Sequence, residues 1–193
     1  MSALPRRTFT PEEYLILENQ AAYRSQFIDG EIYAMAGAEF EHTVIVNNID
    51  FALKTAFGER PCNSHTQDVR VKVDKADMYT YPDVVALCGE PRFDRSSRPA
   101  MLLNPQAVFE VLSPSTEAFD RGDKLLRYRT LDSLTDYILV ASDAVRVEHF
   151  TRLPGGTWTM TEHRQPGDRV PLRALEVGLT LAQIYRRVAF PDQ

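Results

Sequence analysis

The sequence has few cysteines and no long apolar run, and both absences narrow the class of protein. Its two cysteines, Cys62 and Cys88, lack the close spacing of a metal-binding pair. A disulfide between them remains an open alternative, and free thiols in a reducing compartment are the simpler interpretation. No window reaches the roughly 18 apolar residues that a membrane-spanning helix requires, and no apolar stretch follows the N-terminal arginines. We therefore expect a cytoplasmic protein with no membrane partner.

The short motifs of several enzyme classes are also missing. The chain has no Gly-rich phosphate loop, no paired CxxC and no HExxH, and no serine lies in a nucleophile-elbow pattern. Its net charge of −5 provides no overall attraction to nucleic acid. A local basic face can still exist on an acidic protein, so the net charge does not exclude a nucleic-acid substrate.

The overall composition is typical of a soluble globular protein. The 193 residues are 44% hydrophobic and 25% charged, and a chain of this length can bury a core without further cross-links. We expect a single domain over residues 1–193, in which residues 151–193 form a C-terminal strand and helix extension.

Helix and strand patterns alternate along the chain. Thr10 and Glu13 form a capping-box pattern at the start of a helix, and Asp29-Gly30 is a hairpin turn signal. The other predictions are helices over Phe40–Phe57 and Thr116–Leu131, strands over Gln67–Val73, Tyr79–Leu87, Ala107–Leu112, Asp136–Val140, Val145–Phe150 and Thr157–Met160, and a terminal helix capped by Thr180. This order predicts an α/β (α+β) fold, with a mixed central β-sheet flanked by helices.

Two acids interrupt apolar strands and carry the chemical prediction. Asp83 begins one strand and Glu110 lies inside another, where a carboxylate is costly unless it is paired or bound to a cation. Oxygen ligands of this kind suit Mg²⁺ or Mn²⁺. Asp120, Lys124 and Tyr128 follow at i, i+4 and i+8, on one helix face. A surface Asp120–Lys124 ion pair is the alternative interpretation of that spacing.

Six groups of residues carry a family resemblance. They are Ile28-Asp29-Gly30-Glu31-Ile32-Tyr33-Ala34-Met35-Ala36-Gly37, His42, Gln67-Asp68-Val69-Arg70-Val71, Tyr81-Pro82-Asp83-Val84-Val85, Glu110-Val111-Leu112-Ser113-Pro114-Ser115-Thr116, and Asp120 with Lys124 and Tyr128. Together they resemble the Uma2 family, also called DUF820, of bacterial restriction endonuclease-like proteins. The resemblance implies a PD-(D/E)XK nuclease fold, a metal-dependent phosphodiesterase core, and an active site at Asp83, Glu110 and a lysine.

The chain departs from the family pattern at two positions. The superfamily lysine usually lies two residues after the glutamate, where this chain has Leu112. The resemblance implies that the next helix supplies the lysine instead, which matches Lys124. Many relatives carry a glutamate shortly before the Asp-Gly turn, where this chain has Gln26.

The resulting hypothesis is a metal-dependent endonuclease that hydrolyses DNA. Asp83 and Glu110 bind Mg²⁺ or Mn²⁺, the Val111 carbonyl completes the metal site, and Lys124 assists the attacking water. Further candidates around the site are His42, Asp68, Asp120 and Tyr128. We expect a homodimer, because two sites related by a two-fold axis can cut both strands of a duplex. The alternatives are a catalytically inactive nuclease-fold module that binds nucleic acid or a protein partner, and a structural interaction protein.

Overall fold

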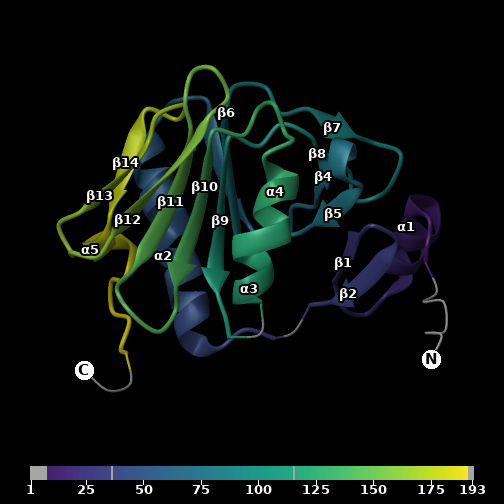
Figure 1. The fold of residues 1–193 in the computed structure, drawn as a ribbon, viewed down its shortest axis with the longest axis horizontal. Coiled ribbons are helices and arrows are strands. Elements are labelled where there is room, and N and C mark those ends of the chain that lie inside the picture. Colours follow the sequence, from purple (N-terminus) through teal and green to yellow (C-terminus); the bar gives the residue numbers. More distant parts are fainter. Residues whose placement is uncertain (1–7, 36, 115, 191–193) are drawn as a thin grey trace.

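The computed structural model describes residues 8–35, 37–114 and 116–190. Ala36 and Ser115 of the family motifs, and residues 191–193 of the predicted extension, lie outside these ranges. The described chain forms a central sheet, a second sheet beside it and a small C-terminal ribbon (Figure 1). No helix in this part of the chain is long and apolar enough to cross a bilayer.

The central sheet is mixed and has helices on both sides. Its order is β12 (Trp158–His163), β11 (Val147–Arg152), β10 (Asp136–Ala141), β9 (Ala107–Leu112), β6 (Val84–Cys88) and β3 (Cys62–Thr66). Among the described pairings of this sheet, β9 and β10 alone are parallel, as a strand–helix–strand crossover requires. α2 (Phe40–Phe57) covers one face, and α3 (Glu117–Phe119) with α4 (Leu125–Tyr128) covers the other (Figure 1). The predicted fold class is confirmed.

Alternate residues of β9 enter two different cores. Phe109 and Val111 pack with α2, whereas Val108 and Leu112 pack with α4 and the second sheet. Every residue of β9 is buried, because helices cover both faces of the strand. Glu110 has the same parity as Val108 and Leu112, so its side chain belongs to the α4 side of the sheet.

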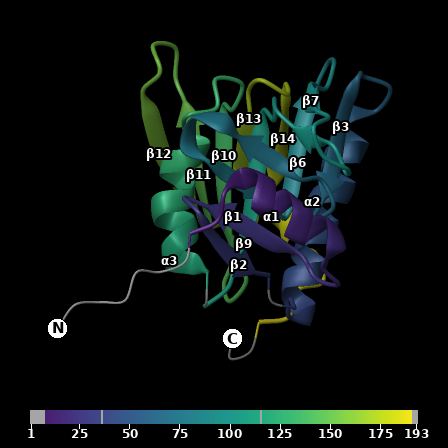
Figure 2. The ribbon, with the colours of Figure 1, turned by 90° about the vertical axis from the view of Figure 1, so that its right-hand side faces the viewer.

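The second sheet joins the N-terminal hairpin to the middle of the chain. Its order is β2 (Glu31–Ala34), β1 (Ser25–Ile28), β5 (Met78–Thr80), β4 (Val71–Val73), β8 (Met101–Leu102) and β7 (Phe93–Asp94). α1 (Pro11–Gln20) lies against this sheet (Figure 2). Its Tyr14 ring stacks on that of Phe27, with ring centroids 5.2 Å apart. A short 3₁₀ turn covers Asp74–Ala76.

The capping and turn patterns predicted from the sequence are present at the ends of these elements. Thr10 accepts a hydrogen bond from the Glu13 N–H at 3.2 Å, and the Glu13 carboxylate accepts one from the Thr10 N–H at 2.9 Å. The predicted capping box at the start of α1 is therefore confirmed, and the helix ends at Gln20. Asp29 and Gly30 have φ of 47° and 82°, which the predicted tight hairpin turn requires.

Two predicted strands are wrong in their extent. The prediction over Tyr79–Leu87 splits into β5 in the second sheet and β6 in the central sheet. Pro82 lies at the change of sheet and has no N–H for a ladder. The prediction over Gln67–Val73 shrinks to β4, while the polar strand β3 before it was missed.

The helix predicted over Thr116–Leu131 is interrupted. A kink within Asp120–Lys124 separates α3 from α4, and Gly122 has non-helical dihedrals there, φ −103° and ψ −106°. A kink of this kind changes the direction of the helix and of the side chains that follow it.

The C-terminal segment packs into the same core as α2. β13 (Arg169–Leu172) and β14 (Val177–Thr180) form an antiparallel ribbon that the sequence patterns did not predict. α5 (Leu181–Ile184) follows, with the predicted Thr180 cap. The Asn48 side chain of α2 donates a hydrogen bond to the Ile184 carbonyl at 3.0 Å, which attaches this end of the chain to the main helix.

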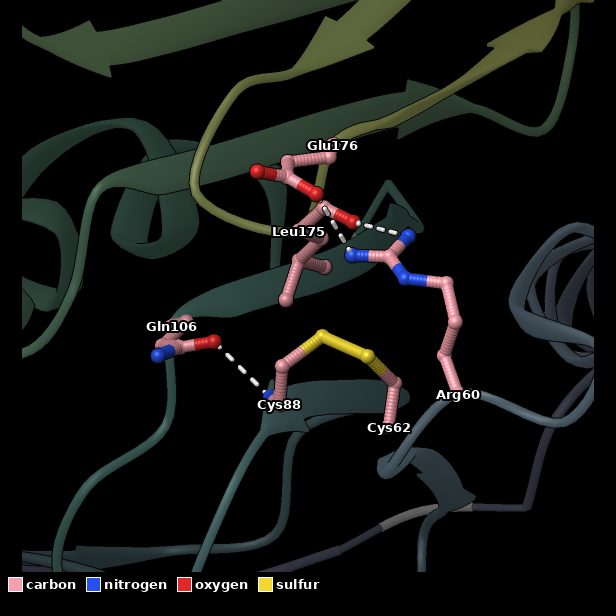
Figure 3. Close-up of a disulfide and its surroundings, with 6 residues drawn as sticks. All are labelled: Arg60, Cys62, Cys88, Gln106, Leu175 and Glu176. Atoms are coloured by element: carbon pink, nitrogen blue, oxygen red, sulfur yellow. Dashed lines mark hydrogen bonds and ion pairs between the residues drawn. A yellow bond between two sulfur atoms is a disulfide. The ribbon is translucent and has the colours of Figure 1, made fainter.

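The two cysteines form a disulfide, contrary to the simpler expectation of free thiols. Cys62 of β3 and Cys88 of β6 are directly opposed in the strand register, and their sulfurs are bonded (Figure 3). The Cys88 N–H donates to the Gln106 side chain at 2.8 Å, and Arg60 donates to the Leu175 carbonyl at 2.9 Å. The bridge therefore cross-links the edge strand β3 to β6, and Arg60, just before β3, bonds to the turn between β13 and β14.

Candidate active site

Asp83 and Glu110 lie at the same end of neighbouring strands. β6 and β9 pair antiparallel, and Val84 opposite Phe109 is the last pair of that register. Asp83 precedes Val84, and Glu110 follows Phe109. The two acids therefore occupy the next opposed positions, from which side chains share one face of the sheet.

Lys124 reaches the same place from the helical segment after β9. Its Nζ lies 2.9 Å from Glu110 Oε1 and 3.0 Å from Asp120 Oδ1. All three side chains are 4% exposed. Lys124 therefore forms buried ion pairs with both Asp120 and Glu110. The alternative of a surface Asp120–Lys124 ion pair is wrong.

Two buried tyrosines lie beside Glu110 and Asp120. The Tyr128 hydroxyl donates to Glu110 Oε1 at 3.4 Å, and the Tyr137 hydroxyl donates to the Asp120 carbonyl at 3.0 Å. Their ring centroids are 5.4 Å apart. Burial raises the pKa of both phenols well above the usual value, so both hydroxyls keep their protons and remain donors.

His42, in the first turn of α2, contacts Asp83 directly. Its Nε2 lies 3.2 Å from Asp83 Oδ2, which also accepts a hydrogen bond from the Val111 N–H at 2.7 Å. Because Pro82 precedes Asp83 and β6 begins only at Val84, the side chain of Asp83 takes the place of a strand partner for Val111.

His42 and Asp83 each stabilise the charged form of the other. Burial by itself would raise the pKa of Asp83, but the His42 hydrogen bond and charge, with the Val111 N–H, hold it below the usual value. Burial would likewise lower the pKa of His42, and the Asp83 carboxylate raises it instead. The two groups therefore form an ion pair at mildly acidic pH.

Glu110 is held differently from Asp83. Burial raises the pKa of Glu110 to about 8, with a smaller contribution from the Asp120 and Asp83 carboxylates, although Lys124 opposes the shift. Burial disfavours the charged form of Lys124 as well, but its two carboxylate partners raise its pKa above the usual value. Lys124 is therefore a cation, and Glu110 releases its proton easily only when more positive charge arrives.

The donor set has the composition of a divalent-cation site, but its side chains are not arranged as one. Asp83, Glu110 and Asp120 provide three carboxylates for the single ammonium of Lys124 and the imidazole of His42, and Asp83 is the acid that reaches solvent, with a side chain 13% exposed. Carboxylate oxygens with a main-chain carbonyl and water are the ligands that Mg²⁺ and Mn²⁺ take. Among the described residues, no group of three or more His, Cys, Asp or Glu is arranged to hold a metal ion.

The structure does not bring Asp68 to this group. The Asp68 side chain is 76% exposed and pairs with Arg24. Its neighbour Gln67 contacts the site instead, and Gln67 Nε2 donates to Asp83 Oδ1 at 3.2 Å. β3 ends at Thr66, and Gln67 has φ of 36°. The alternation that pointed to Asp68 does not continue through such a turn, so no sequence signal identified Gln67.

The structure shows what surrounds Leu112 and Gln26, the two departures from the family pattern. Leu112 is buried in the apolar core on the α4 side of the sheet. Gln26 accepts a hydrogen bond from the Thr80 hydroxyl at 2.6 Å.

The fold is of the restriction endonuclease-like class. A crystal structure of a "putative nuclease belonging to DUF820" from Anabaena variabilis matches with a TM-score of 0.76 and 16% identity, over 94% of this chain and 99% of that one. The likeness to that structure shows the fold.

The family itself is shown by sequence. Residues 11–183 match the family model Uma2, described as "Putative restriction endonuclease", and the chain belongs to this family. Two uncharacterized proteins of Synechocystis sp. are similar to it. One is 36% identical over 81% of this chain and 88% of its own length. The other is 33% identical over 96% of each.

Proposed function

We propose that this protein is a metal-dependent endonuclease that hydrolyses phosphodiester bonds in DNA. The observation that carries the proposal is the contact of Lys124 with Glu110, beside Asp83 on the adjoining strand. A buried ammonium between acids, next to a solvent-facing carboxylate, is the composition expected of a site for phosphoryl charge.

Each residue has a role that its contacts support. Asp83 is held ionised by His42, so it is ready to ligate Mg²⁺ or Mn²⁺ together with Glu110 and the Val111 carbonyl. A divalent cation bound there would polarise a phosphoryl oxygen and lower the pKa of a bound water. Lys124 supplies a fixed positive charge toward the reacting phosphate, and Asp120 holds Lys124 in place.

The substrate approaches from the side of Asp83 and His42. Their side chains are 13% and 11% exposed, whereas those of Glu110 and Lys124 are 4% exposed. The scissile phosphate therefore meets Asp83 first. Glu110 and Lys124 act from the protein side of the same cluster.

A nicking assay on supercoiled plasmid tests the proposal. We expect the wild-type protein to cleave with Mg²⁺ or Mn²⁺ and to stop cleaving in EDTA, and Asp83→Asn and Glu110→Gln to lose at least ~10²-fold in rate. Asp94→Asn is the matched control, because Asp94 also pairs with a lysine, Lys72, in the second sheet. Cleavage that survives both site variants would overturn the assignment, and a wild-type protein that binds DNA without cleaving it would favour the inactive binding module.

We further propose that the protein acts as a homodimer, because two sites related by a two-fold axis can cut both strands. Light scattering at low micromolar concentration should give twice the 21.9 kDa mass of one chain. A constant mass of one chain would contradict the dimer and leave a monomer that nicks single strands.

A further inference from the structure

A polar cavity lies near the candidate active site. It has a volume of about 410 Å³ and lies between the end of α1, the start of β1 and the loop at Arg98-Pro99. Three arginines line it, Arg24, Arg70 and Arg98, with the aromatic rings of Tyr23 and Tyr81. None of the three arginines belongs to the Asp83–Glu110–Lys124 cluster.

Arg70 is buried in this cavity with an incomplete set of partners. It is 1% exposed, its Nε donates to the Tyr81 hydroxyl at 2.8 Å, and its Nη2 donates to Asn19 at 3.3 Å. Its Nη1 has no hydrogen-bond partner in the part of the chain that the structure describes. A buried guanidinium with a free donor is costly unless an anion completes it.

The nearby acid Glu18 is linked to Arg70 only through the Tyr81 hydroxyl and does not contact Nη1. The Glu18 carboxylate accepts hydrogen bonds from the Ser25 N–H at 3.0 Å, from the Ser25 hydroxyl and from the Tyr81 hydroxyl at 3.0 Å. Within residues 8–35, 37–114 and 116–190, Arg70 forms no ion pair of its own. The Tyr81 ring lies between two guanidiniums, 5.4 Å from Arg24 and 5.5 Å from Arg70.

We propose that this cavity binds a phosphate group of a nucleotide unit. Arg70 lines the cavity wall, and its unpaired Nη1 would turn to the phosphate in the bound state, while the exposed Arg98 adds charge at the rim. Guanidinium groups suit phosphate oxygens because several donors lie in one plane. The volume is in the range of small-ligand pockets, and the Tyr23 ring, 66% exposed, is available for a base to stack on.

The cavity is connected to the candidate active site through one residue. Arg24 Nη1 donates to the Gln67 carbonyl at 2.8 Å, and the Gln67 side chain donates to Asp83 at 3.2 Å. A nucleotide unit held by Arg70 would therefore lie next to the phosphate that meets Asp83. This choice of nucleic-acid phosphate as the natural ligand rests on the proposed function, whereas the phosphate site itself does not.

Calorimetric titration in EDTA at constant ionic strength tests the site separately from cleavage. The probes are inorganic phosphate, thymidine 5′-monophosphate and a short single-stranded DNA. We expect all three to bind the wild-type protein, with inorganic phosphate displacing the DNA. Arg70→Met should weaken each by ~10 to 100-fold, the scale of losing a charged hydrogen-bond donor, and Arg98→Met should weaken each by a smaller factor.

Arg173→Met is the matched control, because Arg173 is an exposed arginine between β13 and β14. No binding of any probe to the wild-type protein, or equal weakening by Arg173→Met, would overturn the proposal. If Arg70→Met does not fold, Arg98→Met decides, and unchanged binding in that variant overturns it. Binding of the two small probes without the DNA keeps the site and assigns it to free nucleotides. Binding without cleavage keeps the site and contradicts the nuclease proposal.

Discussion

Replacement of Lys124 by methionine probes the centre of the cluster. Methionine keeps most of the aliphatic volume and removes the ammonium that lies 2.9 Å from Glu110 and 3.0 Å from Asp120. Breaking a buried ion pair from one side leaves an uncompensated charge, which typically costs about 3–5 kcal/mol of unfolding free energy. An exposed pair would cost under about 1 kcal/mol.

The loss should also depend on pH. Lys124 lowers the pKa of Glu110, which in the wild-type protein is about 8, so Lys124→Met should raise it further. Above that pH the folded variant keeps a proton that the folded wild-type protein has released. The loss should therefore grow with pH, by up to about 1.4 kcal/mol for each unit.

Urea unfolding at pH 6, 8 and 9 measures both effects, and Lys72→Met is the control. Lys72 also bridges two acids, Asp74 at 2.7 Å and Asp94 at 2.8 Å, but outside the site. Where both variants are folded, plasmid cleavage should fall by about 10²-fold or more in Lys124→Met and stay at the wild-type rate in Lys72→Met. A Lys124→Met loss under about 1 kcal/mol at every pH would refute the reasoning, and unchanged cleavage would refute its catalytic part.

Three further outcomes are expected. The raised pKa of His42 contributes stability that is complete below the ordinary histidine pKa of about 6.5 and is lost as pH rises through the raised value. His42→Gln should therefore flatten that part of a stability–pH curve, and an unchanged curve would contradict the ion pair. Mn²⁺ affinity, measured by calorimetry, should rise with pH up to about 8 as Glu110 loses its proton, and Glu110→Gln should abolish that rise. The disulfide joins residues 26 positions apart, so reductant should lower the unfolding free energy of the wild-type protein by about 3.5 kcal/mol. Reductant should not change the unfolding free energy of the double variant Cys62→Ser, Cys88→Ser. Equal sensitivity of the two proteins would count against the bridge.

The elements that could be predicted are those with local causes. The helix over Phe40–Phe57 has strong apolar periodicity, and Thr10 and Thr180 have complete capping boxes, which need only residues three positions away. Glu110 was found because a single acid in an apolar strand needs a partner. The i, i+4 relation of Asp120 and Lys124 then directed attention to the partner that the structure shows.

The elements that could not be predicted have tertiary causes. β3 is a polar segment that becomes a strand because β6 lies beside it, and the same pairing brings the two cysteines together. Gln67, rather than Asp68, contacts Asp83 because the positive φ of Gln67 ends the alternation of the strand pattern. The burial of Arg70 depends on α1 and the Arg98 loop closing over β4 from distant parts of the sequence.

The central claim is that Asp83 and Glu110 share a divalent cation. Anomalous diffraction from a crystal soaked in Mn²⁺ at pH 8.5, above the pKa of about 8 for Glu110, tests it most directly. The account predicts one manganese peak with carboxylate oxygens of Asp83 and Glu110 within about 2.0–2.3 Å, and no such peak in a crystal of Asp83→Asn. A manganese ion bound elsewhere, or none bound near these two residues, would contradict the account.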